Sequence, residues 1–165
     1  MIPIEKRRGF TLIELLIVIS ILAVLAAIVF VALDPATRFK DTRDTRRFSD
    51  VAELLHAIKI NQVDNDGAYI STITALTDGN IYMIGTGLTA CAANPCDAAV
   101  TSNSSCVSLA ALVSGGYIES VPISPTGVTT WTAVLSGYTL SKTSTGAITI
   151  QACESENAPS VTLTR

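Results

Sequence analysis

The sequence predicts an α+β fold in which a long N-terminal helix packs on a small antiparallel sheet. Three observations support this prediction. Residues 10–33 form an almost unbroken apolar run, residues 48–58 repeat apolar side chains at helical spacing, and the second half alternates apolar and polar residues at period two. The 165 residues are 48% hydrophobic and only 15% charged, which excludes a disordered chain.

The apolar run of residues 10–33 contains one charged residue, Glu14. A helix of this length spans roughly 36 Å, compared with about 30 Å for the hydrocarbon core of a membrane. The run is also longer than the apolar core of a cleaved secretory signal, which has about 7–15 residues. We therefore expect residues 10–33 to be a retained transmembrane helix in contact with lipid.

Residues 34–66 are predicted to form an amphipathic helix. Asp34 is a favourable N-cap and Pro35 suits the first helical position, so the helix either restarts or kinks there. Residues 65–67, Asn-Asp-Gly, are typical of a helix end. One helix face is apolar: Phe48, Val51, Leu55 and Ile58.

Charges of both signs alternate between Arg38 and Arg47, and Asp44 is placed to pair with Arg47 at the i+3 position. Two interpretations of this stretch stay open. It is either a solvated helix face or a surface that pairs laterally with another copy of the chain.

Residues 67–165 are predicted to form a globular, β-rich head. Residues 60–165 hold 13 Ser and 16 Thr, and Thr together with Val, Ile and Tyr favours strands. We expect a strand at 81–84, a short helix within 107–113, a hairpin of 138–140 with 148–152, and a last strand at 161–164. From Asn61 onward the net charge is −5 (2 basic, 7 acidic), so no nucleic-acid partner is expected.

Four cysteines lie beyond the apolar run: Cys91, Cys96, Cys106 and Cys153. An even number favours two disulfides and a location outside the cytoplasm. A zinc site is the weaker alternative, because no Cys-x2-Cys pair exists and the single His56 is far upstream. The spacing favours pairing Cys91 with Cys96 and Cys106 with Cys153. The alternative pairs Cys96 with Cys106 and Cys91 with Cys153.

The sequence contains no catalytic constellation. It has no Gly-x-Ser-x-Gly turn, no glycine-rich phosphate loop and no His-Glu-x-x-His motif. We therefore expect no enzymatic activity, no catalytic residue and no cofactor.

The charges that flank the apolar run and the cysteines predict opposite orientations in the membrane. Three basic residues precede the run and five follow it closely, so the positive-inside rule alone would leave the C-terminal side in the cytoplasm.

The stretch Gly9-Phe10-Thr11-Leu12-Ile13-Glu14, preceded by Lys6-Arg7-Arg8, resembles the class III signal of type IV prepilins and pseudopilins. Looser similarity continues through residues 65–69, 116–122 and 137–140. The resemblance implies that residues 1–9 are a leader peptide, which prepilin peptidase cuts between Gly9 and Phe10. It also implies methylation of the new Phe10 amine and a pilin-like fold.

The resemblance further implies a single-pass inner-membrane protein with its head outside the cytoplasm, which agrees with the cysteines. An inner-membrane assembly platform would then build it into a pilus or pseudopilus, together with copies of itself and other pilin-like subunits. Glu14 is expected to act in assembly. A carboxylate in an apolar run costs about 2.5–3.5 kcal/mol on insertion scales, so a functional partner such as the Phe10 amine is expected.

Three functions stay open on the sequence alone. The first is a structural subunit that polymerises into an extracellular filament. The second is a pseudopilin of a type II secretion system, and the third is a membrane-anchored binding protein that never polymerises. Type II pseudopilins often use the loop that matches residues 121–125 for calcium. Ser124 stands here where a carboxylate would help, so no metal site is predicted.

Overall fold

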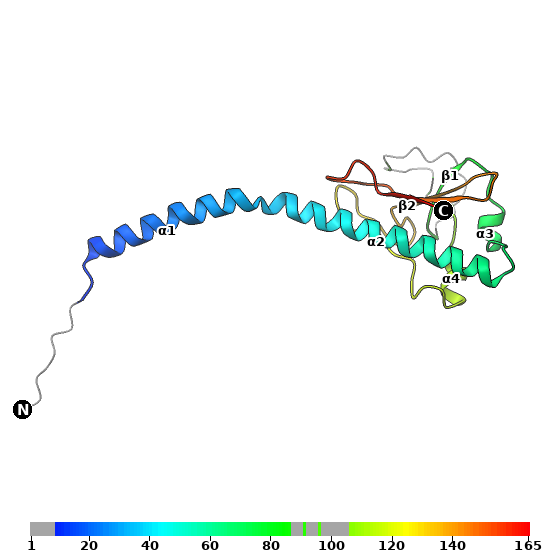
Figure 1. The fold of residues 1–165 in the computed structure, drawn as a ribbon, viewed down its shortest axis with the longest axis horizontal. Helices are drawn as coiled ribbons and strands as arrows, with labels where there is room; N and C mark the ends of the chain where they lie inside the picture. The colour runs from blue at the N-terminus through cyan, green and yellow to red at the C-terminus, as the bar shows by residue number, and fades with distance from the viewer. Residues whose placement is uncertain (1–8, 87–90, 92–95, 97–105) are drawn as a thin grey trace, which may run out of the picture. The chain divides into compact units, whose positions relative to one another are not determined.

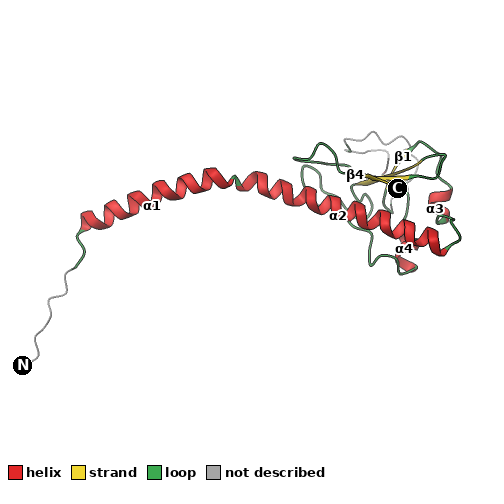
Figure 2. Ribbon diagram, viewed as in Figure 1, coloured by secondary structure: helices red, strands yellow, loops and turns green. Residues whose placement is uncertain are grey.

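The computed structural model describes residues 9–86, Cys91, Cys96 and residues 106–165 (Figure 1). The chain divides into two compact units, Met1–Arg38 and Phe39–Arg165. The first unit contains helix α1, Leu12–Leu33, and most of helix α2, Pro35–Asp64, belongs to the second. The predicted α+β fold is confirmed, since α2 packs on a small antiparallel sheet (Figure 2).

Of the two alternatives at Pro35, a restart or a kink, the structure shows a restart. Asp34 ends α1 in the left-handed region, with φ 37° and ψ 70°, so the hydrogen-bond pattern of α1 does not continue into α2. The end of α2 is also as predicted. Asp66 and Gly67 both take positive φ, and the Gly67 N–H donates back to the Gln62 carbonyl at 2.8 Å.

The sheet has four strands in the order β1-β2-β3-β4, and each neighbouring pair is antiparallel. The strands are β1 (Ile81–Met83), β2 (Tyr138–Lys142), β3 (Ile148–Ala152) and β4 (Thr162–Thr164). The predicted β2–β3 hairpin and the last strand are confirmed. Leu140 lies opposite Ile150 in the register, and Ile150 lies opposite Leu163, so this row of side chains points to one face.

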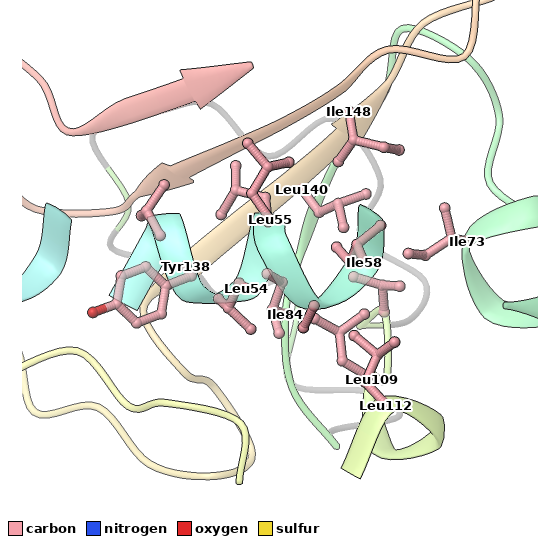
Figure 3. Packing of buried hydrophobic residues seen from close by; sticks show 14 of the residues in the cluster. Leu54, Leu55, Ile58, Ile73, Ile84, Leu109, Leu112, Tyr138, Leu140 and Ile148 are labelled. Atoms are coloured by element: carbon pink, nitrogen blue, oxygen red, sulfur yellow. The ribbon is translucent and has the colours of Figure 1, made fainter. Parts of the chain in front are cut away.

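One core joins this face of the sheet to α2 (Figure 3). Leu54, Leu55 and Ile58 of α2 are buried against Leu140 and Ile148. Two short helices complete the core, α3 (Ser71–Thr74) through Ile73 and α4 (Ala110–Ser114) through Leu112. The sequence did not predict α3, because four residues are too few to show a helical period.

The helix expected within residues 107–113 begins only at Ala110. Val107 instead makes a parallel bridge to Ile84, in which its N–H donates to the Met83 carbonyl at 2.8 Å. An extended backbone at Val107 cannot start a helix, so a tertiary hydrogen bond overrides the local apolar run.

Two disulfides are present, but both pairings considered above are wrong. Cys91 bonds to Cys106, and Cys96 bonds to Cys153. The bridge between Ile84 and Val107 brings Cys106 to the end of β1. There, buried Cys91 packs with Met83, Trp131 and Cys153. The short spacing between Cys91 and Cys96 does not decide the pairing, because each bonds to a distant cysteine next to a strand or bridge residue: Cys106 precedes Val107, and Cys153 follows β3.

Candidate processing and assembly site

The start of α1 is built around Thr11 and Glu14. Thr11 is the N-cap, and its hydroxyl accepts a hydrogen bond from the Glu14 N–H at 3.3 Å. The Glu14 carboxylate accepts from the Thr11 N–H and from the Thr11 hydroxyl, each at 2.8 Å and each through Oε2. This reciprocal capping box satisfies two backbone donors that a helix start leaves open.

The predicted cleavage point lies immediately before this cap. Gly9 and Phe10 precede α1 in non-helical backbone, and Phe10 is 90% exposed. A Cβ added at Gly9 would meet no atom of the described residues within 4 Å, so none of these residues requires a glycine here. A requirement for a small residue at this position must come from something that binds the segment.

The side chains of α1 are apolar on all sides and none is buried. At about 1.5 Å per residue, its 22 residues extend roughly 33 Å, which matches the hydrocarbon core of a membrane. Within the described residues, this N-terminal helical stretch is the one long and apolar enough to cross a membrane. Its single hydroxyl, Ser20, donates to the Leu16 carbonyl at 2.7 Å and so leaves no open donor facing lipid.

Part of the charged start of α2 faces the protein interior, whereas Arg38, Lys40 and Arg46 are exposed. A solvated face is therefore wrong for the buried positions, and lateral pairing with another copy stays a prediction. Arg47 is fully buried, and Asp44 and Asp50 are each less than 10% exposed. The expected pair of Asp44 with Arg47 forms at 2.8 Å. The sequence did not reveal the other partners, because they lie between 77 and 114 residues away and no local spacing reports them.

Arg47 binds two loops to α2 at once. Its guanidinium donates to Ser124 Oγ at 3.2 Å, to the Pro125 carbonyl at 3.1 Å and to Glu154 Oε2 at 3.3 Å. It also contacts Glu156 Oε1 at 3.0 Å. We call this group of side chains the Arg47 clamp: Arg43, Asp44, Arg47, Glu154 and Glu156. In the loop of residues 121–125, where calcium was considered, Ser124 Oγ and the Pro125 carbonyl are thus hydrogen-bond acceptors of a guanidinium.

The carboxylates of the clamp are held in the charged form. Hydrogen bonds from Arg43, at 2.6 and 2.5 Å, hold the pKa of Glu156 at about 2. Burial acts to raise the pKa of Asp44. The backbone N–H groups of residues 156–158 and the Arg47 guanidinium outweigh burial, so the pKa is lowered.

A second buried polar contact lies one turn further along α2. The Tyr138 hydroxyl donates to Asp50 Oδ2 at 2.5 Å, and burial together with this carboxylate raises the pKa of Tyr138. In the described part of the chain, no three His, Cys, Asp or Glu side chains are grouped to hold a metal ion. The clamp and the Tyr138 contact position the head on α2.

Comparison with known proteins supplies one match. Residues 5–30 match the family model of the prokaryotic N-terminal methylation motif. No curated protein and no solved structure matches the chain. The matched segment includes Gly9, Phe10 and the Thr11–Glu14 cap. Residues 5–30 therefore carry the class III signal of type IV pilins and pseudopilins, which supports a type IV pilin-like or pseudopilin precursor.

Proposed function

We propose that this chain is a structural, non-enzymatic pilin-like subunit that is processed by prepilin peptidase and polymerises into an extracellular filament. The observation that carries the proposal is the methylation motif at residues 5–30, which lies at the start of a helix with every apolar side chain exposed. Such a helix needs an apolar environment, first lipid and later the α1 helices of other subunits.

Processing would cut the chain between Gly9 and Phe10 and leave a methylated amine on Phe10. The exposed, non-helical backbone of this segment supports access by a peptidase. The new positive charge would lie four residues before Glu14, which supports pairing between these two groups.

The hydrogen bonds of Glu14 support its role in assembly. Thr11 occupies only Oε2, and Oε1 accepts no hydrogen bond within the described residues. The carboxylate can therefore keep its cap and still accept the Phe10 amine of a neighbouring helix. A buried ion pair of this kind contributes more to register than to stability.

The two disulfides support a head that matures outside the cytoplasm, because such bonds form and persist in oxidising compartments. The subunit would then begin as a single-pass inner-membrane protein. An assembly platform in that membrane would transfer it to the filament, together with copies of itself and other pilin-like subunits.

The test is to shear the surface of cells that produce the chain and to sequence the N-terminus of what is released. We expect filaments whose subunits begin at methylated Phe10, and none from cells without prepilin peptidase. If the processed chain stays in the membrane and forms filaments only in cells that also produce a type II secretion system, the chain is instead a pseudopilin. Unprocessed, unpolymerised chain would overturn the proposal.

A further inference from the structure

The unit Phe39–Arg165 carries an open apolar groove of about 530 Å³. Buried Ile84 and Leu109 line it, and partly exposed Val113, Val121 and Ile123 complete its apolar surface. Three of its hydroxyls donate to backbone carbonyls of the same unit: Ser136 to Ile84 at 2.7 Å, and Thr86 and Ser114 to Ala133 and Ala111, each at 3.2 Å. The groove therefore offers an apolar surface with few free polar atoms.

One border of this apolar groove is acidic. A neighbouring surface shares Ser120, Val121 and Ile123 with the groove and adds Glu53 and Glu119, both exposed, together with Arg46 and Asp50. With one arginine and three carboxylates, this border has a formal charge of −2. We call Glu53 and Glu119 the acidic rim. An occupant of the groove would combine an apolar side chain with a neighbouring positive charge.

The same unit exposes a side chain of that description. Phe39 is 66% exposed on α2 and is followed by exposed Lys40, which makes no ion pair within the described residues. The other exposed apolar side chains fit less well. Val63 precedes the acidic Asp64, and Val128 has no charged neighbour in sequence. Phe48 follows Arg47, whose charge is buried in the clamp. Ile60 is only 39% exposed, and the ammonium of its neighbour Lys59 already donates to Gln62 and Tyr69.

We propose that Phe39 of one copy inserts into the apolar groove of the next copy, with Lys40 paired to Glu119 at the acidic rim. This contact deepens the proposed function and rests on it, because it names a surface by which subunits of the filament meet. Phe39 and the groove are different surfaces of one unit, so the contact is heterologous and repeats along an open helical filament without closing.

The direct test is photo-cross-linking in the full-length chain. Benzoyl-phenylalanine replaces Phe39 in cells that make filaments, and the linked peptides are identified after irradiation. We expect links to residues 109–123 of a second copy. The same probe at Phe48 is the matched control and is expected to link elsewhere. Links from position 39 that avoid the groove would overturn the proposal.

The second test exchanges the charges. Lys40→Glu and Glu119→Lys are each expected to lower the yield of sheared filaments at least about tenfold, and the double variant is expected to restore most of it. Phe39→Ala should lower the yield similarly, whereas Phe48→Ala should not. Membrane levels and intact disulfides show that each variant folds. A double variant no better than the single ones would overturn the pairing.

These tests separate the two proposals. If the variants assemble as the wild type does, the proposed function is unaffected and the proposed interface is wrong. If the processed wild-type chain forms no filament at all, the proposed function is overturned and this interface with it.

Discussion

Glu14 can serve two purposes at the start of α1, as a cap together with Thr11 and as a partner for a second donor. The Glu14 carboxylate caps the helix through Oε2 while Oε1 stays open to a second donor. A Val at position 14 would remove both roles, whereas a change at Thr11 would remove the cap alone. The two roles can therefore be separated by mutation.

Glu14→Val is expected to insert into the membrane at wild-type level or better, because a charge leaves the apolar run. Filaments should be absent or scarce, since the Phe10 amine loses its partner. Thr11→Val is the matched control. It costs about 1 kcal/mol of helix stability but keeps the carboxylate, so filaments should form. The measurement is the amount of subunit in sheared filaments against that in membranes. Abundant filaments from Glu14→Val alone would contradict the register argument.

Gly9→Val is expected to block removal of the leader. None of the described residues contacts a Cβ at this position, so the substitution is expected to leave their fold unchanged and to act on the peptidase. N-terminal sequencing of the membrane-bound variant should find the leader retained. A variant that begins at Phe10 would show that the small side chain is not what the peptidase recognises.

At the scale of elements, α2 is the part to which the rest of the head is fixed. Its apolar face packs on the sheet through Leu54, Leu55 and Ile58, and its Arg47 clamp holds the loops at 124–125 and 154–158. The backbone is tight around the clamp, because a Cβ at Gly127 would lie 2.7 Å from Glu154 Oε2 and 2.9 Å from Arg47.

Arg47→Met is expected to destabilise the head by about 3–5 kcal/mol, because it leaves buried carboxylates without their cation. Arg46→Met, on the exposed side of the same helix, is the matched control and should change stability by less than about 0.5 kcal/mol. Denaturant unfolding of the full chain in detergent, followed by Trp131 fluorescence, measures both. Equal unfolding midpoints would show that the clamp contributes nothing to stability.

For the whole molecule, the clamp makes the free energy of unfolding of the head depend on pH in the acid range. Glu156 has its pKa lowered from 4.5 to about 2, so its contribution is complete above about pH 4.5 and is lost as the pH falls toward 2. The pKa of Asp44 is also lowered, so its contribution to stability is lost in the same direction of pH. Unfolding midpoints measured from pH 6 to pH 2 should fall in this window. Glu156→Gln should flatten the curve, whereas Glu53→Gln, at an exposed site, should leave it as in the wild type.

The disulfides give a second prediction for the whole molecule. A non-reduced peptide map of the mature protein should contain Cys91 linked to Cys106 and Cys96 linked to Cys153. A peptide that links Cys91 to Cys96 would instead support the pairing that spacing alone favours. Free thiols at all four positions would remove the argument for a head outside the cytoplasm.

The sequence by itself determined most of the elements and showed the motif at the start of α1. The apolar run, the Asp34-Pro35 restart, the end of α2 and the β2–β3 hairpin are local signals, since neighbouring residues alone set helix ends and strand alternation. The motif around Gly9 and Glu14 was equally visible, because it lies in one continuous segment.

Only the tertiary structure decided which distant groups meet. Arg47 lies among Ser124, Glu154 and Glu156, so a charged side chain from a stretch with the composition of a surface became part of the interior. Cysteine pairing was decided in the same way, because the Ile84–Val107 bridge brings Cys106 to Cys91. The physical reason is common to both. Burial and pairing depend on contacts between residues far apart in the chain, and spacing along the sequence carries no information about them.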